Sequence, residues 1–251
     1  MGRIIGVLNY KGGTAKTTTV VNLGAGLAVR GKRVLCIDLD AQGSVATYLG
    51  VPYTYSLTHL LLEQAEPRAC IVQARDNLDL IASDESLLRA EGELWRMDDN
   101  QKARQTLVGK LRGLEDDYDY VILDFSPSVS ILSESSLLYV RELIVPVSMG
   151  YMALVGTRQV IHALKTIGRM PIHHVRLYLV VPTFYSARLR KDREVMEILR
   201  RHFADKVAKP IRLNVKLSEA PSHQKSIFEY APRSHGAIDY TRLVERVVRD
   251  G

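Results

Sequence analysis

Apolar runs and segments of helical spacing alternate along this chain from its first residues. Residues 3–9, RIIGVLN, form an apolar run, residues 17–31, TTTVVNLGAGLAVRG, carry apolar side chains at helical spacing, and residues 32–40, KRVLCIDLD, form a second apolar run. Short apolar runs rich in β-branched residues predict strands, and the 3.6-residue spacing predicts a helix between them. Gly31 is a residue type that commonly ends a helix. The chain therefore begins with a predicted strand–helix–strand unit.

The same alternation continues toward the C-terminal end. Further apolar runs, with β-branched residues on both faces, predict buried strands at residues 78–83, 118–126, 142–148 and 175–184. Helical spacing predicts helices over Gln101–Leu114, Ser130–Val140, Val155–Gly168 and Asp192–Phe203. Residues 41–67 have the weakest pattern and are a candidate for mobility. This rhythm predicts an α/β protein with one doubly wound, mostly parallel sheet, helices on both faces and a single domain over residues 1–251.

The composition is that of one soluble domain. The chain has 251 residues, 46% of them hydrophobic and 25% charged, which is enough to bury a sizeable core. No apolar run approaches the roughly 18 residues of a spanning helix, and the N-terminus lacks the layout of a signal peptide, so we expect a cytoplasmic protein. Cys36 and Cys70 lack the spacing of a metal site or a disulfide framework, and we expect two buried, reduced thiols.

A glycine-containing stretch follows the first predicted strand at residues 10–19, YKGGTAKTTT. Glycines let backbone N–H groups converge on a phosphate, Lys16 supplies a positive charge, and Thr17 offers a hydroxyl to Mg²⁺ at the start of the helix. The general phosphate-loop pattern G-x-x-x-x-G-K-[ST] is missed twice, because Tyr10 replaces its first glycine and Ala15 its last. Forcing alanine to a positive φ costs on the order of 1–2 kcal/mol. We expect a phosphate site that is weakened but not lost.

This loop resembles the deviant phosphate loop of the ParA/MinD ATPases, KGGxGK[ST], in its extra lysine, its paired glycines and its K-T-T-T ending. Residues 36–44, CIDLDAQGS, are similar to the DxDPQG switch of that family, and residues 118–128, YDYVILDFSPS, are similar to its Walker B strand. Asp38, Asp40 and Asp124 stand at the carboxyl ends of predicted strands, where ligands bind in open α/β sheets. The resemblance implies a P-loop NTPase that binds ATP and Mg²⁺.

The resemblance also implies roles for individual residues. Lys16 would hold the β- and γ-phosphates, Asp40 would orient the attacking water, and Lys11 would reach the partner's phosphates across a nucleotide-sandwich homodimer; these three are the implied catalytic residues. The implied metal residues are Thr17, Asp38 and Asp124. The implied nucleotide-binding residues are Lys11, Gly12, Gly13, Thr14, Ala15, Lys16, Thr17, Thr18 and Thr183.

The C-terminal part carries a narrower resemblance. Residues 211–243, IRLNVKLSEAPSHQKSIFEYAPRSHGAIDYTRL, are similar to the C-terminal segment of the chromosomal ParA proteins called Soj, so the likeness spans nearly the whole chain. Such proteins bind ATP, dimerise, coat double-stranded DNA without sequence preference and release it when a ParB-like adaptor stimulates hydrolysis. The resemblance implies the same partners here and a place at the bacterial nucleoid. The cargo stays open between a chromosome, a plasmid and a protein assembly.

Positive charge is concentrated in one segment. Residues 185–216 contain ten basic and four acidic side chains, an excess equal to the net charge of +6 of the whole chain. On charge alone, a solvated helix face and an interaction surface remain equally good interpretations. Taken with the resemblance, the segment offers candidates for contacts with DNA phosphates, namely Arg188, Arg190, Lys191, Arg193 and Lys216.

The sequence also bears on three other functions. A MinD-like ATPase at a membrane surface would use an amphipathic C-terminal helix, but residues 240–251, YTRLVERVVRDG, are short and contain no Trp or Phe. We expect that helix to dock on the body of the protein, and we expect no membrane. A nucleotide-gated scaffold with little hydrolysis stays open beside slow, partner-stimulated hydrolysis, because of Ala15. A metabolic P-loop enzyme or an iron–sulfur reductase is disfavoured by the absence of cluster-type cysteines and of a substrate motif.

Overall fold

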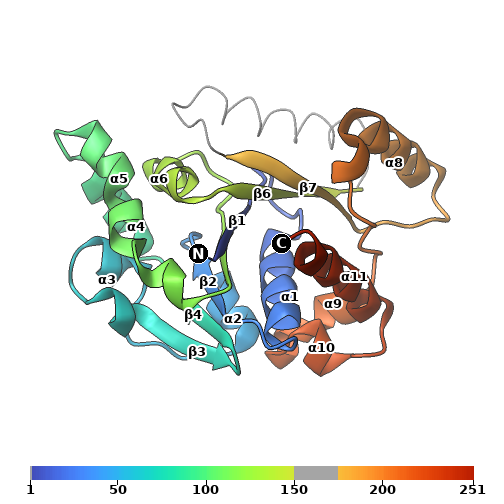
Figure 1. Cartoon of the computed structure of the whole chain (residues 1–251), viewed down its shortest axis with the longest axis horizontal. Helices are drawn as coiled ribbons and strands as arrows, with labels where there is room; N and C mark the ends of the chain where they lie inside the picture. Colours follow the sequence, from blue (N-terminus) through green and yellow to red (C-terminus); the bar gives the residue numbers. More distant parts are fainter. Residues whose placement is uncertain (1, 150–174) are drawn as a thin grey trace.

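A seven-stranded sheet in the order β3-β4-β2-β5-β1-β6-β7 runs through the computed structural model of the chain (Figure 1). The structure describes residues 2–149 and 175–251. The strands are β1 Arg3–Val7, β2 Val34–Asp38, β3 Ile71–Arg75, β4 Leu78–Ile81, β5 Tyr120–Asp124, β6 Glu142–Ser148 and β7 Arg176–Thr183. Neighbouring strands are parallel, except that β3 pairs antiparallel with β4. The predicted fold class, a doubly wound and mostly parallel sheet, is confirmed.

Helices lie between the strands along the chain and also follow the last strand, β7. They are α1 Lys16–Ala28, α2 Ser44–Leu49, α3 Leu57–Leu61, α4 Leu87–Trp95, α5 Asn100–Leu111, α6 Ile131–Tyr139, α8 Arg190–Phe203, α9 Val215–Glu219, α10 Ile227–Tyr230 and α11 His235–Arg249. Short 3₁₀ turns accompany them in the described part of the chain: η1 Pro67–Cys70, η2 Leu114–Asp117, η3 Ala204–Lys206 and η4 Ala220–His223. The predicted helices over 101–114, 130–140 and 192–203 are confirmed to within about three residues. The predicted helix over 155–168 lies outside the described residues.

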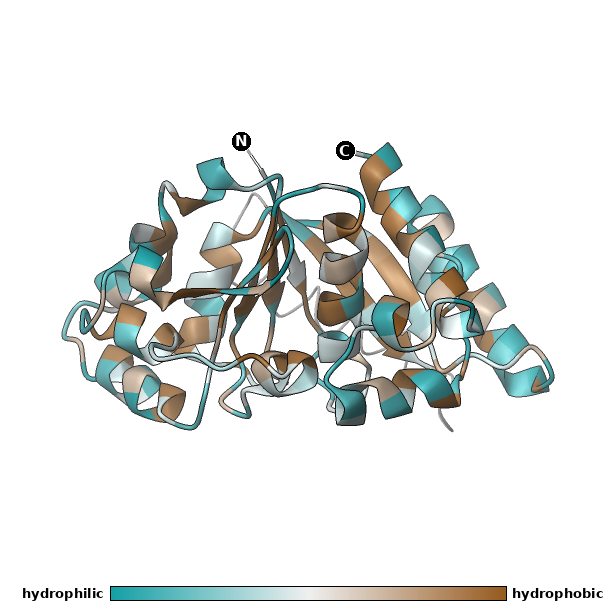
Figure 2. Cartoon of the chain, turned by 90° about the horizontal axis from the view of Figure 1, so that it is seen from below, coloured by the Kyte–Doolittle hydropathy of each residue, from teal (hydrophilic) through white to brown (hydrophobic). Residues whose placement is uncertain are grey.

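The two faces of the sheet are covered by different helices. One apolar cluster joins the strands to α1, α2, α10 and α11, and a second joins them to α3, α4, α5 and α6. A third cluster packs α8 on β6 and β7. Successive residues of one strand enter opposite clusters, as Ile4 and Ile5 of β1 do, because successive side chains of a strand point to opposite faces. In Figure 2 the strands are accordingly brown, and teal residues lie on the peripheral helices.

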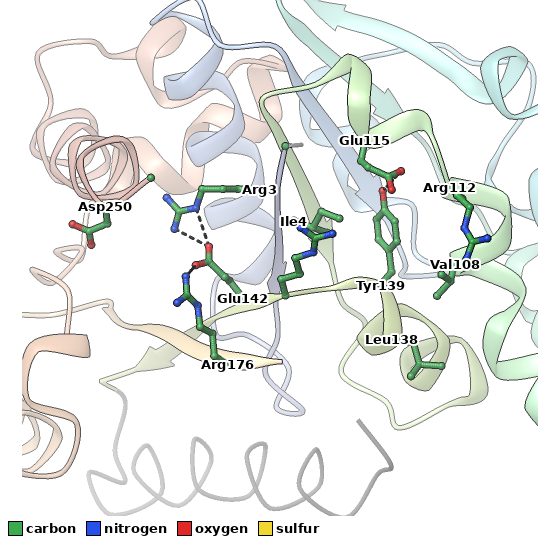
Figure 3. A pocket seen from close by; sticks show the side chains of 13 residues that line it. Arg3, Ile4, Val108, Arg112, Glu115, Leu138, Tyr139, Glu142, Arg176 and Asp250 are labelled. Carbon is green, nitrogen blue, oxygen red and sulfur yellow. Dashed lines mark hydrogen bonds and ion pairs between the residues drawn. The ribbon is translucent and has the colours of Figure 1, made fainter. Parts of the chain in front are cut away.

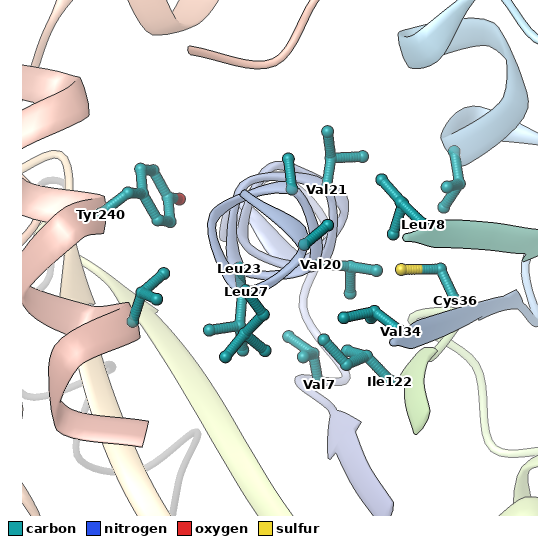
Figure 4. Close-up of a cluster of buried hydrophobic side chains, with 14 of the residues drawn as sticks. Val7, Val20, Val21, Leu23, Leu27, Val34, Cys36, Leu78, Ile122 and Tyr240 are labelled. Atoms are coloured by element: carbon teal, nitrogen blue, oxygen red, sulfur yellow. The ribbon is translucent and has the colours of Figure 1, made fainter. Parts of the chain in front are cut away.

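Helix α1 occupies the centre of the first cluster, with Val20, Leu23 and Leu27 directed into it (Figure 4). A β-carbon at Gly26 would lie 2.6 Å from Cγ2 of Val244, so glycine lets α1 and α11 approach closely. Helix α1 ends at Ala28, and Gly31 follows with φ of 75°. The prediction that Gly31 caps this helix is therefore wrong by two residues, because the C-cap is Val29.

The sequence patterns missed strand β3 and the helices α2, α3, α4, α9 and α10. Strand β3 is a five-residue edge strand, and its residues 71–75 show no clean alternation of buried and exposed positions. Helices α2 and α3 lie within residues 41–67, for which no element was predicted, because helices of six and five residues are too short to display a helical period. Cys36 and Cys70 are buried and free, as expected. Within the described residues, none of the helices has both the length and the apolar character needed to span a membrane.

Candidate nucleotide site

The glycine-containing loop leaves β1 at the carboxyl edge of the sheet and ends where α1 begins at Lys16. Gly13 has φ of 70°, and Ala15, the N-cap residue of α1, has φ of 68° and ψ of 35°. Both residues therefore adopt the left-handed conformation, which glycine tolerates and which costs alanine on the order of 1–2 kcal/mol. The positive φ that the sequence predicts at Ala15 is present in the structure.

The two lysines of the loop differ in their surroundings. The side chain of Lys16 is buried, with 8% of the residue exposed, and its Nζ lies 3.4 Å from the carbonyl oxygen of Lys11. Burial lowers the pKa of Lys16, whereas the negative charges of Asp124 and Asp40 act to raise it. Lys11 is exposed, and its backbone N–H donates to Oδ1 of Asn9 at 3.0 Å. One ammonium group is thus held inside the loop, and the other belongs to an exposed residue.

Asp124 ends β5 directly beside the start of α1. The hydroxyl of Thr17 donates to its Oδ2 at 2.6 Å. The residue is 1% exposed, and its Oδ1 is buried with no hydrogen-bond partner among the described residues. Burial, with the nearby charge of Asp38, raises the pKa of Asp124 well above its usual range. A buried carboxylate oxygen without a donor is costly unless a cation or a donor is supplied from outside the chain.

This pair of oxygens suits a hard divalent cation. Mg²⁺ prefers oxygen ligands and keeps several of its waters, and the hydroxyl of Thr17 and the carboxylate of Asp124 lie together at the N-terminus of α1. The residues present therefore fit Mg²⁺, with Thr17 as a ligand and Asp124 acting directly or through a water. Backbone N–H groups of residues 12–17 would hold the phosphates that the cation accompanies.

Asp38 has a contact that sequence reasoning did not foresee. It is fully buried, and its two carboxylate oxygens accept backbone N–H groups, Oδ1 from Asp40 and Oδ2 from Val45, each at 3.0 Å. Burial raises the pKa of Asp38 to about 7, against the effect of these two hydrogen bonds. The carboxylate thereby ties the end of β2 to the first turn of α2, and its implied role at the metal stays a prediction.

Two more residues of the predicted set lie close to this site. Asp40 is half-buried in the loop between β2 and α2, and its Oδ1 accepts the backbone N–H of Gln42 at 3.0 Å. Thr183, at the end of β7, donates its hydroxyl to the carbonyl oxygen of Thr14 at 3.2 Å. The structure thus brings the ends of β1, β2, β5 and β7 together with the loop. The catalytic role of Asp40 stays a prediction.

Sequence reasoning also missed a polar residue on the buried face of α1. Asn22 is 0% exposed, and its amide donates to the carbonyl oxygen of Thr18 at 2.7 Å and lies 3.2 Å from the hydroxyl of Tyr48. Its Oδ1 accepts the backbone N–H of Ile227 at 2.7 Å. The only signal in the sequence was an asparagine inside the apolar stretch VVNLGAG, which by itself does not identify its partners.

The cationic segment begins just beyond β7. On α8, Val195 and Leu199 are buried, and the basic residues are exposed. Three of the five predicted DNA contacts already have partners: Arg190 pairs with Glu194 at 2.8 Å, Arg193 donates to the carbonyl of Ala187 at 2.7 Å, and Lys216 pairs with Glu219 at 2.8 Å. Arg188 and Lys191 are exposed and have no partner within residues 2–149 and 175–251.

Comparisons with known proteins agree with this geometry. A profile of the AAA domain family matches residues 2–176. The sporulation initiation inhibitor protein Soj of Bacillus subtilis is 36% identical over 256 aligned residues, which cover 100% of each chain. The chromosome-partitioning ATPase Soj of Thermus thermophilus is 38% identical and covers 98% of this chain and 95% of its own.

Solved structures share the fold over the whole chain. The cobyrinic acid a,c-diamide synthase of Mycobacterium smegmatis, with a bound ATP analogue and magnesium, superposes with a TM-score of 0.82 at 28% identity, covering 99% of this chain and 95% of its own. The cell division ATPase MinD of Pyrococcus furiosus superposes with a TM-score of 0.81 at 23% identity, covering 100% of both chains. At that lower identity the likeness to MinD concerns the fold alone.

Proposed function

This chain belongs to the ParA/MinD family of ATPases, and from that premise we propose that it is an ATP-dependent, dimerising switch that binds double-stranded DNA without sequence preference. At the coarser level it is a partition or positioning ATPase, in line with its chromosome-partitioning relatives. Its switching would drive partition or positioning of a chromosome, plasmid or protein cargo at the nucleoid, with hydrolysis stimulated by a ParB-like or other adaptor. The observation that carries the proposal is the buried, half-satisfied carboxylate of Asp124 beside Thr17 and Lys16.

Phosphoryl transfer needs the phosphate charge neutralised and a water placed in line. In our proposal Lys16 and the loop amides hold the β- and γ-phosphates, and Thr17 and Asp124 hold Mg²⁺, which neutralises phosphate charge when bound. Asp40 orients the attacking water. A solved relative of the same fold contains an ATP analogue and magnesium, which supports this choice of nucleotide and metal.

We assign dimer formation to the exposed lysine of the loop. Lys11 is exposed, whereas Lys16 is buried within the same loop, so the two ammonium groups can serve different subunits. Lys11 would stabilise charge on the partner's triphosphate, and a triphosphate held between two subunits would join them. ATP thereby controls whether the two cationic segments act together.

In our proposal, DNA binding depends on the cations that have no partner among the described residues. Arg188 and Lys191 can neutralise phosphates without first breaking an ion pair, whereas Arg190 and Lys216 have to exchange Glu194 and Glu219 for DNA. Phosphate contacts give affinity that falls steeply with salt and ignores sequence. Doubling the segment in an ATP-held dimer raises the number of contacts, which explains how nucleotide would control binding.

The membrane alternative loses support from α11. Its apolar residues Leu243, Val244 and Val247 are buried, and the helix packs against α1 and α10, so this apolar face is covered by the body of the protein. The scaffold alternative depends on Ala15. Its left-handed conformation costs the loop conformational free energy, but Lys16, Thr17 and Asp124 still lie together. We therefore propose slow, partner-stimulated hydrolysis.

One binding experiment tests the switch. DNA affinity is measured with ATP·Mg²⁺, with ADP·Mg²⁺ and without nucleotide over a range of salt concentrations, with the oligomeric state followed in parallel. We expect an ATP-dependent dimer whose DNA affinity falls with salt. A chain that stays monomeric with ATP, or an affinity that does not change with salt, contradicts the proposal, and binding to vesicles of anionic lipid in place of DNA supports the membrane alternative.

Charge variants sharpen the same experiment. Replacing Arg188 and Lys191 by alanine removes two phosphate contacts and should reduce the slope of log affinity against log salt by about 0.9 for each. Arg33 is a matched control, because it is an exposed arginine before β2, at the opposite edge of the sheet. The Arg33→Ala variant should keep the parental slope, and an equal loss in both variants would mean that the contacts are not confined to the cationic segment.

A further inference from the structure

The buried amide of Asn22 joins three separate elements. Its Nδ2 contacts the Thr18 carbonyl and the Tyr48 hydroxyl, and its Oδ1 accepts the N–H of Ile227. Thr18 lies in the first turn of α1, Tyr48 on α2, and Ile227 opens α10. An amide with this many bonds and no exposure to water fixes the relative positions of its neighbours, because breaking any bond leaves a buried polar group unsatisfied.

Two of these elements belong to the nucleotide site. Thr18 follows Thr17, whose hydroxyl contacts Asp124. Tyr48 lies on the short helix α2, and the first turn of that helix is held by Asp38 through the backbone N–H of Val45. A change in the loop or at the end of β2 when a triphosphate binds therefore reaches Asn22 through one helical turn on each side.

The third element leads to the cationic segment. Helix α10 is a single turn, fixed at its start by a capping box between Ser226 and Glu229. At its other end the hydroxyl of Tyr230 donates to Oε2 of Glu219 at 2.7 Å, and the same oxygen accepts Nζ of Lys216 at 2.8 Å. Nζ of Lys216 also lies 5.6 Å from the centre of the Tyr230 ring. The ammonium group of Lys216 is thus positioned by α10.

We propose that Asn22 is a positioning residue that couples the nucleotide loop to the cationic segment. It holds α10 in register with α1 and α2, and α10 sets the position of Lys216 through Tyr230 and Glu219. When the first turn of α1 and α2 move together with bound triphosphate, α10 follows, and Lys216 exchanges Glu219 for a DNA phosphate. This inference rests on the proposed function, since it concerns the nucleotide dependence of DNA binding.

A second buried bond from α1 provides the matched control. Oγ1 of Thr19 lies 3.3 Å from the hydroxyl of Tyr240 on α11, and both groups are buried. This bond also joins α1 to the C-terminal part of the chain, but it reaches α11 and not α10. Tyr240 packs against α1 (Figure 4), so a Tyr240→Phe variant loses one buried hydroxyl and keeps the ring.

The experiment compares DNA affinity with ATP·Mg²⁺ and with ADP·Mg²⁺ in four proteins: the parent, Asn22→Leu, Tyr230→Phe and Tyr240→Phe. We expect the ratio of the two affinities to fall about two- to thirtyfold in Asn22→Leu and Tyr230→Phe, the range of coupling changes in such networks. The affinity for ATP itself should stay at the parental value in Tyr230→Phe. Tyr240→Phe should keep the parental ratio.

The outcomes separate this inference from the proposed function. A parent whose DNA affinity is the same with ATP and ADP overturns both. A nucleotide-dependent parent with an unchanged ratio in Tyr230→Phe, or with an equal loss in Tyr240→Phe, overturns the coupling role alone. If Asn22→Leu does not fold, Tyr230→Phe decides, because Tyr230 is only half-buried and its ring is retained.

Discussion

Two carboxylates, Asp124 and Glu142, are buried on the two strands that flank β1, at opposite edges of the sheet. Asp124 ends β5 at the carboxyl edge, and Glu142 begins β6 at the amino edge. Asp124 is 1% exposed and has one oxygen without a partner in the described part of the chain, whereas Glu142 is 4% exposed and both of its oxygens accept arginine donors. Its partners are Arg3, at 2.9 and 2.7 Å, and Arg176 (Figure 3).

The difference indicates that Asp124 belongs to a ligand-binding site, whereas Glu142 belongs to an ion pair that stabilises the fold. Arg3 also donates to the carbonyl of Val247 and lies 4.7 Å from the centre of the Tyr178 ring, so the ion pair at the amino edge joins the first strand to β6, β7 and α11. A cavity of 760 Å³ opens beside it. In the part of the chain that the structure describes, three acidic side chains line this cavity, those of Glu142, Glu115 and Asp250. Each of their carboxylates already accepts a hydrogen bond or forms an ion pair within the chain. The carboxyl edge is therefore identified as the candidate site by the carboxylate oxygen of Asp124, which is unpartnered among the described residues, and not by the volume of a cavity.

The largest effect is expected from removing the buried lysine of the carboxyl edge. The Lys16→Ala variant loses the ammonium group that stabilises phosphate charge, and we expect kcat for ATP hydrolysis to fall about 10²- to 10³-fold, or roughly 3–4 kcal/mol. Steady-state hydrolysis measures this effect. Lys32→Ala, at the amino edge, is the control and should keep the parental rate, whereas parental hydrolysis in Lys16→Ala would exclude the assigned role.

At the amino edge the expected loss is in stability. Glu142→Gln removes the charge that two arginines surround, and breaking a buried pair in this way should lower the free energy of unfolding by about 3 kcal/mol. Denaturant unfolding measures it. Glu134→Gln is the matched control, because its pair with Arg104 is partly exposed, at 25% and 41% of the two side chains, and should cost less than about 1 kcal/mol. Equal losses of stability in the two variants would mean that the ion pairs of Glu142 contribute no more than a partly exposed pair.

Sequence patterns predicted the carboxyl edge well because its parts are local. Lys16 and Thr17 stand next to each other in one loop, and Asp38 and Asp124 end strands that are recognisable from their apolar runs. The six strands predicted from those runs are all present. Strand β3 was missed because an edge strand need not be apolar on both faces.

The amino edge and the coupling residues could not be predicted in the same way. Arg3 and Glu142 are 139 residues apart, and Asn22 and Ile227 are 205 apart, so no periodicity or spacing relates them. In the sequence, Arg3 and Glu142 are ordinary charged residues at the start of predicted strands, and Asn22 is one polar residue within a predicted helix. Their roles follow only from the packing that brings distant segments together.

A smaller effect, of opposite sign to that of Glu142, is expected at Asp124. Asp124→Asn removes a buried carboxylate, and burial raises the pKa of that carboxylate because the charged form is disfavoured there. The metal-free variant should therefore gain about 1 kcal/mol in free energy of unfolding. Denaturant unfolding in EDTA measures the gain, and added Mg²⁺ with ATP should stabilise the parent more than the variant. A loss of stability in Asp124→Asn would show that its charge is satisfied as fully as that of Glu142, and the contrast between the two edges would disappear.

The smallest effect concerns the strained alanine of the loop. Ala15→Gly relieves the left-handed conformation but also loosens the unfolded chain, and the two terms should leave a net gain of about 0.5–1 kcal/mol in the free energy of unfolding. Asn77→Gly is the control, because Asn77 also has a positive φ, of 61°, in the turn between β3 and β4, and asparagine tolerates that conformation with little strain. Its stability should therefore stay near the parental value.

The same substitution should change the rate of ATP hydrolysis. Strain in the loop disfavours the geometry of the site without removing any of its functional groups, so Ala15→Gly should hydrolyse ATP faster than the parent, and Asn77→Gly should not. If Ala15→Gly is no more stable and no faster, bound phosphate and the neighbouring turn already compensate for the β-carbon, and the loop is as competent with alanine as with glycine.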